Sequence, residues 1–576
     1  MASPTSFASL PVSSVWILVL VAATAGVYRW FRRISIKHIP GPVDEGNFWC
    51  GNLPDLLQKQ VGENFAGKRD MAELLASKGL LGSVLSFCRL FVEGAVLMDG
   101  YLGQEDRLFV CDPKAMQYIL QVSGYRWPKP RERRAATYML AGKAISFAEG
   151  DDHKRHRNVM QPGFGVPETK ALLPWFSAAA SSVYKITSQW KDILSMSAMQ
   201  SEVFNLYSWV SRGALDALGN GAFDHQFNAV NYEKDPVSNA LSNFIFLFFK
   251  PTSNGAILFL NFVSTLPFFV QRWLNEKLPG PRMDEIRRTR RLATELANEL
   301  VHSKVRELRD GEGKADVMSL LVKANLSENE RGRLTEEEIH SQIRAIFVAG
   351  HETTANSVGW ALLELCRHPE MQKRLRREIR AKEREVRARN GVEGFSVMDL
   401  ESMEYLNAET LRFHPVTPVL YREAGEDDCI PLYKPIITTH GETITEIPVA
   451  KGTKVTLSVA TYNRTKEIFG EDTDSFNPDR WLNQSQKIGQ GVPSLNLYAN
   501  LATFSAGVKS CIGWRFAVLE FQCFLAELIS NFEFSLTKES ERIRREPCLV
   551  MLPTVEDELD KGPQLILKVS VSEKEQ

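Results

Sequence analysis

The sequence predicts a mainly α protein, with one helix-rich domain and small β-sheets behind a single N-terminal transmembrane helix. Residues 335–368 carry apolar side chains at helical spacing, over a length unusual for a globular helix. A second helical pattern follows Cys511, and residues 12–28 form an apolar run without a charge. Strand-like alternation is limited to short stretches such as residues 453–459, so helices dominate the prediction.

The composition is that of an ordinary globular protein with a large core. The chain has 576 residues, 44% of them hydrophobic, and a formal net charge of −1. A nucleic-acid-binding protein would need a strong basic excess, so we predict no nucleic-acid partner. The eight cysteines include no C-x-x-C pair, which argues against a zinc site or a disulfide framework and favours a reducing compartment.

The N-terminal region sets the predicted topology. Residues 12–28, VSSVWILVLVAATAGVY, are just long enough to cross a bilayer. Basic residues follow this run: Arg29, Arg32, Arg33 and Lys37. Residues 23–25 resemble a cleavage site, but a signal peptide carries its basic residues before the apolar run, and basic residues after it keep that side cytoplasmic. We therefore predict a lumenal segment at 1–11, an anchor at 12–28, a basic and Pro/Gly-rich hinge at 29–45 and a cytoplasmic domain at 46–576.

The stretch FSAGVKSCIGWRF, residues 504–516, places Cys511 between a glycine-rich turn and a helix. Gly507 and Gly513 lack a Cβ and allow the backbone to turn tightly and to approach a flat ligand. A helix N-terminus stabilises an anionic sulfur, which is the form that binds iron. Taken alone, however, a single cysteine at such a place is more often a small buried residue.

Two further stretches place polar side chains on predicted helices. In residues 150–165, His153 and Arg157 lie four residues apart and therefore share a helix face, although basic faces are usually just solvated. In the long central helix, Thr335 and Glu338 form a capping box. Further along this helix, the run AGHETT at 349–354 contains a mid-helix glycine and threonines that can bend a helix, and we expect it to open a local groove. Simple helix–helix contact at the glycine is the alternative.

The remaining features lie in shorter segments. Glu409 and Arg412 in ETLRFHP are three residues apart on one helix, a spacing at which most pairs are weak surface contacts. Residues 244–270 are strongly apolar but interrupted by Lys, Pro and Gly, so a second membrane crossing is not expected. Residues 548–571 contain two apolar runs, CLVML and LILKVSV, which predict a small hairpin.

Four of these stretches together resemble the signatures of the cytochrome P-450 family, which builds one large domain from such a span. Residues 504–513 match F-x-x-G-x-[RH]-x-C-x-G, with Lys509 where the family has Arg or His. AGHETT matches [AG]-G-x-[DE]-T-[TS], and ETLR matches E-x-x-R. His153 and Arg157 match W-x-x-x-R, with histidine replacing the tryptophan.

The resemblance implies a role for each matched residue. Cys511 becomes the axial ligand of haem b iron, within a loop shaped by Phe504, Gly507 and Gly513. The predicted propionate anchors are His153, Arg157, Arg422 and Lys509, the last having lost the bidentate fork of arginine. Glu352 and Thr353 are assigned to proton delivery. Glu409, Arg412 and Arg480 form a structural triad, although YLNAETLR is about one turn shorter than in relatives, so either the helix is shortened or residues have been lost from the gene model.

The implied function is a haem-thiolate monooxygenase that inserts one oxygen atom from dioxygen into a lipophilic small molecule. We expect electrons from NADPH through NADPH–cytochrome P-450 reductase, with cytochrome b5 as a second donor, at the endoplasmic reticulum membrane. A basic surface is predicted to receive the donor: Lys154, Arg155, Lys509 and Arg515. Residues 244–270 then match lid helices that dip into the bilayer, with core packing as the alternative. Two other functions stay open, a peroxide-using or rearranging haem-thiolate enzyme and a non-catalytic anchored haem protein.

Overall fold

The computed structural model describes most of the chain from residue 106 onward. The described residues are 36, 38–39, 61–62, 95–99, 106–164, 169–231, 236–241, 244–249, 262–263, 266–312, 316–327, 331–390, 395–403, 408–482 and 491–573. The predicted lumenal segment, the anchor at 12–28 and nearly all of the hinge lie outside this set. Among the described helices, none combines the length and the apolar character that a bilayer crossing requires.

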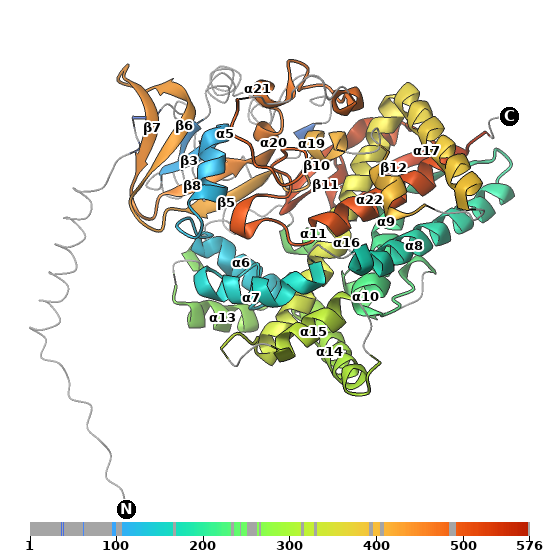
Figure 1. Ribbon diagram of the computed structural model, residues 1–576, viewed down its shortest axis with the longest axis horizontal. Coiled ribbons are helices and arrows are strands. Elements are labelled where there is room, and N and C mark those ends of the chain that lie inside the picture. The colour runs from blue at the N-terminus through green and yellow to red at the C-terminus, as the bar shows by residue number, and fades with distance from the viewer. Residues whose placement is uncertain are drawn as a thin grey trace, which may run out of the picture.

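Helices dominate the described part of the chain, as predicted, and fill most of the body in Figure 1. The longer helices are α6 (Arg131–Ala141), α7 (Gly150–Phe164), α8 (Thr169–Met196), α9 (Leu206–Leu218), α13 (Phe268–Lys277), α14 (Pro281–Arg309), α15 (Val317–Ser327), α16 (Glu336–Arg367), α17 (Pro369–Asn390) and α22 (Trp514–Asn531). The shorter helices are α5 (Pro113–Gln117), α10 (Pro236–Leu241), α11 (Phe244–Phe249), α18 (Val397–Glu401), α19 (Glu409–Phe413), α20 (Val459–Tyr462) and α21 (Lys466–Phe469).

The β part consists of small sheets, two of which lie at one end of the molecule, on the left in Figure 1. One is four-stranded, in the order β2 (Ala95–Asp99), β3 (Asp106–Val110), β8 (Lys454–Ser458), β5 (Val419–Glu423). Beside it is the pair β6 (Asp428–Ile437) and β7 (Thr443–Val449). β8 confirms the strand predicted at 453–459.

The hairpin predicted between the two tail runs is wrong. The first run turns back at Leu549, so that β10 (Ile543–Cys548) pairs with β11 (Val550–Val555), with β1 (Val61–Gly62) on the outer edge. The second run, β12 (Ile566–Val571), instead joins β4 (Ser201–Asn205) and β9 (Phe532–Ser535). The strands that complete each sheet come from distant parts of the chain, so local alternation could not identify the partners.

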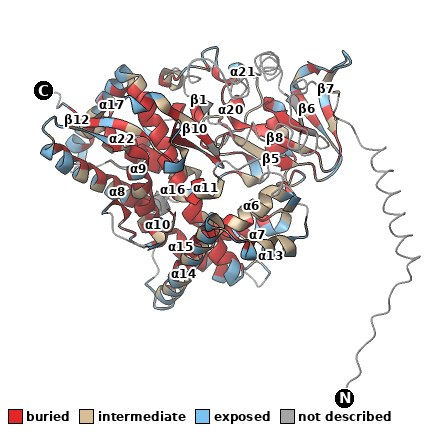
Figure 2. Ribbon diagram, turned by 180° about the vertical axis from the view of Figure 1, so that it is seen from behind, coloured by how far each residue is buried: buried red, intermediate tan, exposed pale blue. Residues whose placement is uncertain are grey.

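The central helix α16 ends where the sequence predicted. Thr335 is its N-cap and forms the capping box with Glu338, while His368 is the C-cap. Most of its residues are buried, and Figure 2 shows buried residues running along α16 and α22 through the middle of the molecule. A helix that is buried around its circumference contributes to the core on several sides, which makes α16 the element on which the other helices pack.

The described residues at the two ends of the apolar segment 244–270 differ in burial. Phe244, Ile245 and Phe246 of α11 belong to the hydrophobic core. In contrast, Phe268 and Phe269 at the start of α13 are 41% and 73% exposed. Core packing therefore accounts for α11, whereas the described start of α13 presents aromatic surface.

Candidate active site

The loop before α22 is held in shape by its own backbone. The N–H of Cys511 donates to the carbonyl of Phe504 at 2.9 Å, and Gly513 is the N-cap of α22. Gly507 has φ of +65°, and a Cβ there would lie 2.0 Å from the carbonyl oxygen of Leu120, so only glycine fits. Gly513 is different, because a Cβ there would make only ordinary contact with Phe164. Within the protein, the fold itself requires glycine at Gly507, while the expected close approach of a flat ligand at Gly513 stays a prediction.

The Cys511 side chain keeps exposed surface although protein surrounds it on most sides. Burial raises the pKa of its thiol, while the N–H of Gly513 and the charge of Arg157 act in the opposite direction. A side chain that combines exposed surface with deep surroundings faces an internal space rather than the outer surface. Cys511 is thus open to a ligand that enters the protein.

The helix α7 brings both of its predicted residues to this loop. Arg157 donates to the carbonyl of Ser510 at 2.7 Å and to its hydroxyl at 3.2 Å, directly beside Cys511. His153 is buried, with its Nδ1 2.8 Å from the hydroxyl of Tyr125. Burial and the nearby charge of Lys129 lower the pKa of His153 to about 3, so the ring is neutral. We conclude that Arg157 supports the cysteine loop and that His153 offers a neutral ring nitrogen.

A cluster of buried cations lies next to His153. Lys509 forms an ion pair with Glu149 at 2.5 Å and donates to the carbonyl of Trp127, and Lys129 reaches the same carboxylate at 3.5 Å. The guanidinium of Arg422, on β5, faces this group and donates to the carbonyl of Tyr421. Burial lowers the pKa of Lys129 to about 7 and that of Arg422 to about 10. In this cluster, the carboxylate of Glu149 is therefore the counterion for three basic side chains, so the described residues hold an excess of basic groups.

The middle of α16 contains the accessible strip that the AGHETT motif predicted. Ala349 is exposed, and Gly350 and Thr353 are half-buried, whereas most of the helix beyond its first turn is buried. The Thr353 hydroxyl donates to the Ala349 carbonyl at 2.7 Å, which is the backward bond expected to bend a helix. The alternative is correct for Gly350, because a Cβ there would lie 2.6 Å from Leu218 of α9. This part of α16 therefore both packs against α9 at Gly350 and keeps accessible surface at Ala349 and Thr353.

Glu352 points into the protein rather than into this strip. It is 1% exposed, and its Oε1 accepts from the backbone N–H of Ile245, on α11, at 3.3 Å. Burial raises the pKa of Glu352 to about 8, so the carboxyl group is protonated at neutral pH. A protonated carboxyl one residue before Thr353 can release a proton.

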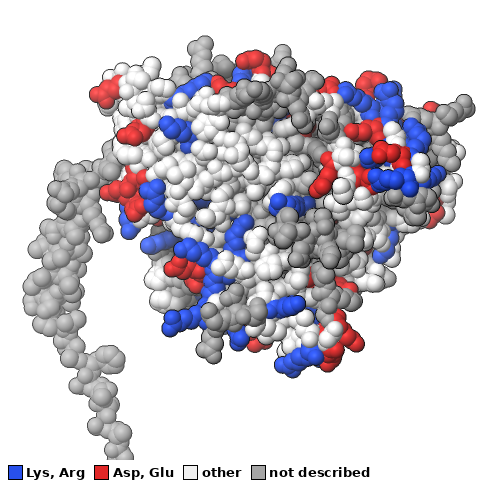
Figure 3. Space-filling model, in the orientation of Figure 1, with Lys and Arg blue, Asp and Glu red and all other residues white. Residues whose placement is uncertain are grey.

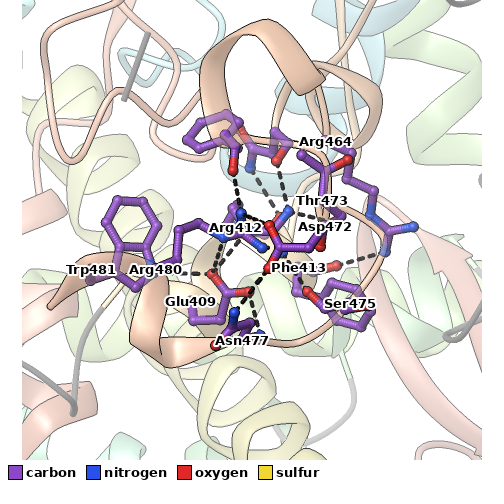
Figure 4. Close-up of polar contacts among 12 residues, drawn as sticks. Glu409, Arg412, Phe413, Arg464, Asp472, Thr473, Ser475, Asn477, Arg480 and Trp481 are labelled. Carbon is purple, nitrogen blue, oxygen red and sulfur yellow. Dashed lines mark hydrogen bonds and ion pairs between the residues drawn. The ribbon is translucent and has the colours of Figure 1, made fainter. Parts of the chain in front are cut away.

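The triad residues lie together in a buried network, shown in Figure 4. The guanidinium of Arg412 donates two hydrogen bonds, of 2.9 and 2.7 Å, to the carboxylate of Glu409, and both side chains are almost fully buried. Arg480 approaches the same carboxylate at 3.5 Å. Arg412 also donates to three backbone carbonyls: those of Asn463, Thr473 and Ser475. The helix α19 spans five residues and contains the ion pair, while residues 404–407, in the segment predicted to be shortened, lie outside the described residues.

Several residues at these places carried no sequence signal. Glu149, just before α7, and Lys129, just before α6, form an ion pair that depends on how these two segments pack in the folded protein. Trp481 donates to Glu409 at 3.0 Å, next to the predicted Arg480. Two members of the predicted donor surface are also engaged inside the protein, since Arg155 binds Glu338 at 2.6 Å and Lys509 binds Glu149. Among the described residues, Lys154 pairs only with the exposed Asp151, at 2.9 Å, so Lys154 and Arg515 are the members of that set left at the surface.

The arrangement is that of a haem-thiolate protein, and the comparisons with known proteins agree. The sequence profile of the cytochrome P-450 family matches residues 85–560. Cytochrome P-450 monooxygenase 205 of Postia placenta is 30% identical over 93% of this chain and 92% of its own length. Ganoderic acid synthetase of Ganoderma lucidum is 28% identical over 97% of this chain and 99% of its own. Cytochrome P-450 monooxygenase claQ of Ampulloclitocybe clavipes is 28% identical over 80% of this chain and 84% of its own.

The chain belongs to the cytochrome P-450 family, whose members are oxygen-incorporating oxidoreductases with haem b as cofactor. The residues present fit that group. Haem b carries two propionates and an iron that takes a thiolate. The described residues offer an open thiol at Cys511 and a surplus of buried basic groups around a single carboxylate, Glu149. The buried basic groups are costly in the protein alone, and the propionates of a bound porphyrin would offset that cost.

Proposed function

We propose that the protein is a membrane-anchored haem-thiolate monooxygenase that uses electrons from NADPH, delivered by NADPH–cytochrome P-450 reductase, to oxidise a lipophilic small molecule. One observation carries the proposal. The Cys511 loop and the Ala349–Thr353 strip both keep exposed surface within otherwise buried surroundings, on elements that pack together. Together they border a space with a thiol on one element and a hydroxyl on the other.

Different residues of this site would contact different parts of the haem. Cys511 would bind the iron, and Arg157 would keep its loop in place through Ser510. Arg422, Lys509 and the neutral ring of His153 would receive the propionates, with Phe504, Gly507 and Gly513 completing the loop. When bound, haem supplies the dioxygen activation, since the redox chemistry belongs to the cofactor. Glu409, Arg412 and Arg480 would hold the surrounding backbone without contacting the reacting atoms.

The acid and the alcohol of α16 would supply protons. Cleavage of the O–O bond consumes protons, and a buried donor can provide them in a dry site. Glu352 is protonated at neutral pH because burial raises its pKa to about 8. Thr353 lies one residue further, and its hydroxyl borders the open strip. This pair is unnecessary for an enzyme that only rearranges peroxides, and we therefore favour the monooxygenase.

Replacing Thr353 by alanine should separate electron use from product formation. We expect NADPH oxidation to continue while product per NADPH falls by at least about fivefold, because a proton relay is lost. The matched control is Thr353→Ser, which keeps the hydroxyl and should retain coupling. Product and NADPH are quantified in the same reductase-supported assay. Unchanged coupling in the alanine variant would remove Thr353 from the mechanism.

A second prediction concerns the buried cations. Glu149→Gln should destabilise the haem-free protein by about 2–4 kcal/mol, because Lys129 and Lys509 lose the carboxylate that pairs with them in a mostly buried site. The haem-loaded protein should lose less, since the propionates replace the missing charge. Thermal unfolding of both forms measures the difference. Equal losses in the two forms would place the cluster away from the propionates.

The proposed membrane and electron-donor partners rest on the N-terminal sequence and on exposed side chains. The apolar run at 12–28 supports an anchor in the endoplasmic reticulum membrane with a cytoplasmic catalytic domain, and the exposed rings of Phe268 and Phe269 suit contact with lipid or with a lipophilic substrate. Basic and acidic side chains intermingle over the face drawn in Figure 3, so no single sign of charge dominates it. Lys154 and Arg515 are our candidates for contact with the reductase or with cytochrome b5.

Feeding experiments test the proposed chemistry. Microsomes that contain the protein and a reductase are supplied with a panel of lipids and terpenoids, and products are identified by mass spectrometry. A product heavier by one oxygen atom that requires NADPH and takes its oxygen from ¹⁸O₂ supports the proposal. Turnover that runs on hydrogen peroxide and ignores NADPH would instead favour the peroxide-using enzyme.

A further inference from the structure

Several buried polar atoms near Glu352 have no hydrogen-bond partner among the described residues. They are Oε2 of Glu352, Nε2 of His351, Oδ1 of Asn356, the hydroxyl of Tyr207 and both carboxyl oxygens of Glu546. None of these five residues is more than 1% exposed. Buried polar groups are nearly always paired, so a group of unpaired ones requires an explanation.

These atoms come from different elements but lie around one place. The Cys548 thiol, on β10, faces both Glu546 and Glu352. The Tyr207 hydroxyl, on α9, faces Glu352 and Cys548 and lies within reach of the Asn356 amide, which can donate to it and leaves the O–H of Tyr207 unused. The helix α11 covers them, and the backbone N–H groups of Phe244 and Ile245, at its start, donate to Glu352. Arg282 on α14 also faces Cys548, is half-buried, and donates to the carbonyls of Leu247 and Phe248. The group therefore extends from the side of α16 toward the outer part of α14.

The unpaired atoms combine acceptors, such as Nε2 of His351 and Oδ1 of Asn356, with protonated carboxyl groups that can donate. The Nδ1 of His351 lies 2.7 Å from the carbonyl of Phe347, and a carbonyl can only accept. That ring nitrogen therefore carries the hydrogen, which leaves Nε2 as an acceptor. The Nε2 atom lies 3.9 Å from Oε1 of Glu352, a separation too long for a direct hydrogen bond. Water is a small double donor that can satisfy several such acceptors at once.

We propose that Glu546, Tyr207, Asn356 and His351 line an internal water site that resupplies the proton of Glu352, with Glu546 as the exchanging carboxyl group. The inference rests on the proposed role of Glu352 as a proton donor. After Glu352 gives up its proton, a proton passes to it through the water from Glu546, which is recharged from the side of Arg282. No electron moves in this exchange.

The charge states around the site are consistent with this task. Burial raises the pKa of Glu546 from its ordinary value of 4.5 to about 8, as it does for Glu352. His351 stays neutral because burial lowers its pKa to about 4, and burial raises the pKa of the Cys548 thiol. At neutral pH both carboxyl groups hold a proton, and above about pH 8 both lose it. We expect the coupling of NADPH use to product to fall in the same range.

Infrared spectroscopy of the resting holoprotein tests the site without turnover. The carboxyl C=O band of protonated Glu352, identified by its loss in Glu352→Gln, should shift on transfer to D₂O within the mixing time. In Glu546→Leu, which places an apolar side chain at the site, we expect the exchange to slow by at least about tenfold. Equally fast exchange in this variant would overturn the inference. Glu520→Gln is the matched control, because Glu520 is also fully buried with an unpaired oxygen but bonds Thr354 instead.

A second variant guards against a folding defect. Glu546→Gln keeps size and polarity but cannot exchange a carboxyl proton. We expect the ratio of hydrogen peroxide released to NADPH consumed, measured with reductase and without added substrate, to rise by at least about threefold. An unchanged ratio would remove Glu546 from the relay. If Glu352→Gln also left the ratio unchanged, the proposed proton delivery itself would fail, and the two failures are thus distinguishable.

Discussion

Replacing Cys511 by serine should abolish both the thiolate spectrum and the activity. The serine hydroxyl does not ionise at neutral pH and is a poor ligand for haem iron, so the electron donation that favours O–O cleavage is lost. We expect reductase-supported turnover to fall by a factor on the order of a thousand or more, the scale seen when an essential group is removed. The carbon monoxide difference spectrum of the reduced protein should no longer show thiolate ligation.

The surface cysteine Cys429 provides the control for this experiment. It is exposed on β6, and Cys429→Ser should leave both the spectrum and turnover unchanged. Thiolate ligation that survives in Cys511→Ser would show that another residue binds the iron. The assignment of the site would then fail as a whole.

The second large effect is expected at Arg412. Truncation to leucine leaves the carboxylate of Glu409 buried without its main partner and leaves three backbone carbonyls without a donor. Breaking a buried pair of this kind costs about 3–5 kcal/mol, a large share of the stability of a typical domain. We expect little folded, haem-containing protein in cells, as measured by haem content per protein and by thermal unfolding.

Two comparison variants separate the charge from the geometry of Arg412. Arg412→Lys keeps the charge but loses the planar fork that binds two carboxylate oxygens, so we expect a partial loss. Arg374→Ala removes a pair with Asp479 in which both side chains are nearly half exposed, and such pairs contribute about 0–1 kcal/mol. Similar losses in Arg374→Ala and Arg412→Leu would contradict the importance we give to the buried network.

Local patterns in the sequence were sufficient to predict the features that depend on neighbouring residues. The capping box of Thr335 and Glu338, the backward bond of Thr353 and the Glu409–Arg412 pair all join residues close in the chain. Spacing along one helix determines such contacts, and they were confirmed.

Features that join distant segments could not be predicted in this way. The tail strands found partners that the alternation did not reveal, and Lys509 pairs with Glu149 from a segment that carries no motif. Strand pairing and the Lys509–Glu149 ion pair both depend on which segments pack together in the folded protein. The local sequence of either segment does not specify its partner.

The carboxylate of Glu338 has a mechanical consequence for the molecule. It accepts the backbone N–H of Thr335 at the start of α16, the guanidinium of Arg155 and the ring of His156, both on α7. Because these bonds converge on one group, α7 cannot slide or rotate without pulling on the first turn of α16. A partner protein that displaces α7 would therefore also displace the N-terminal turn of α16.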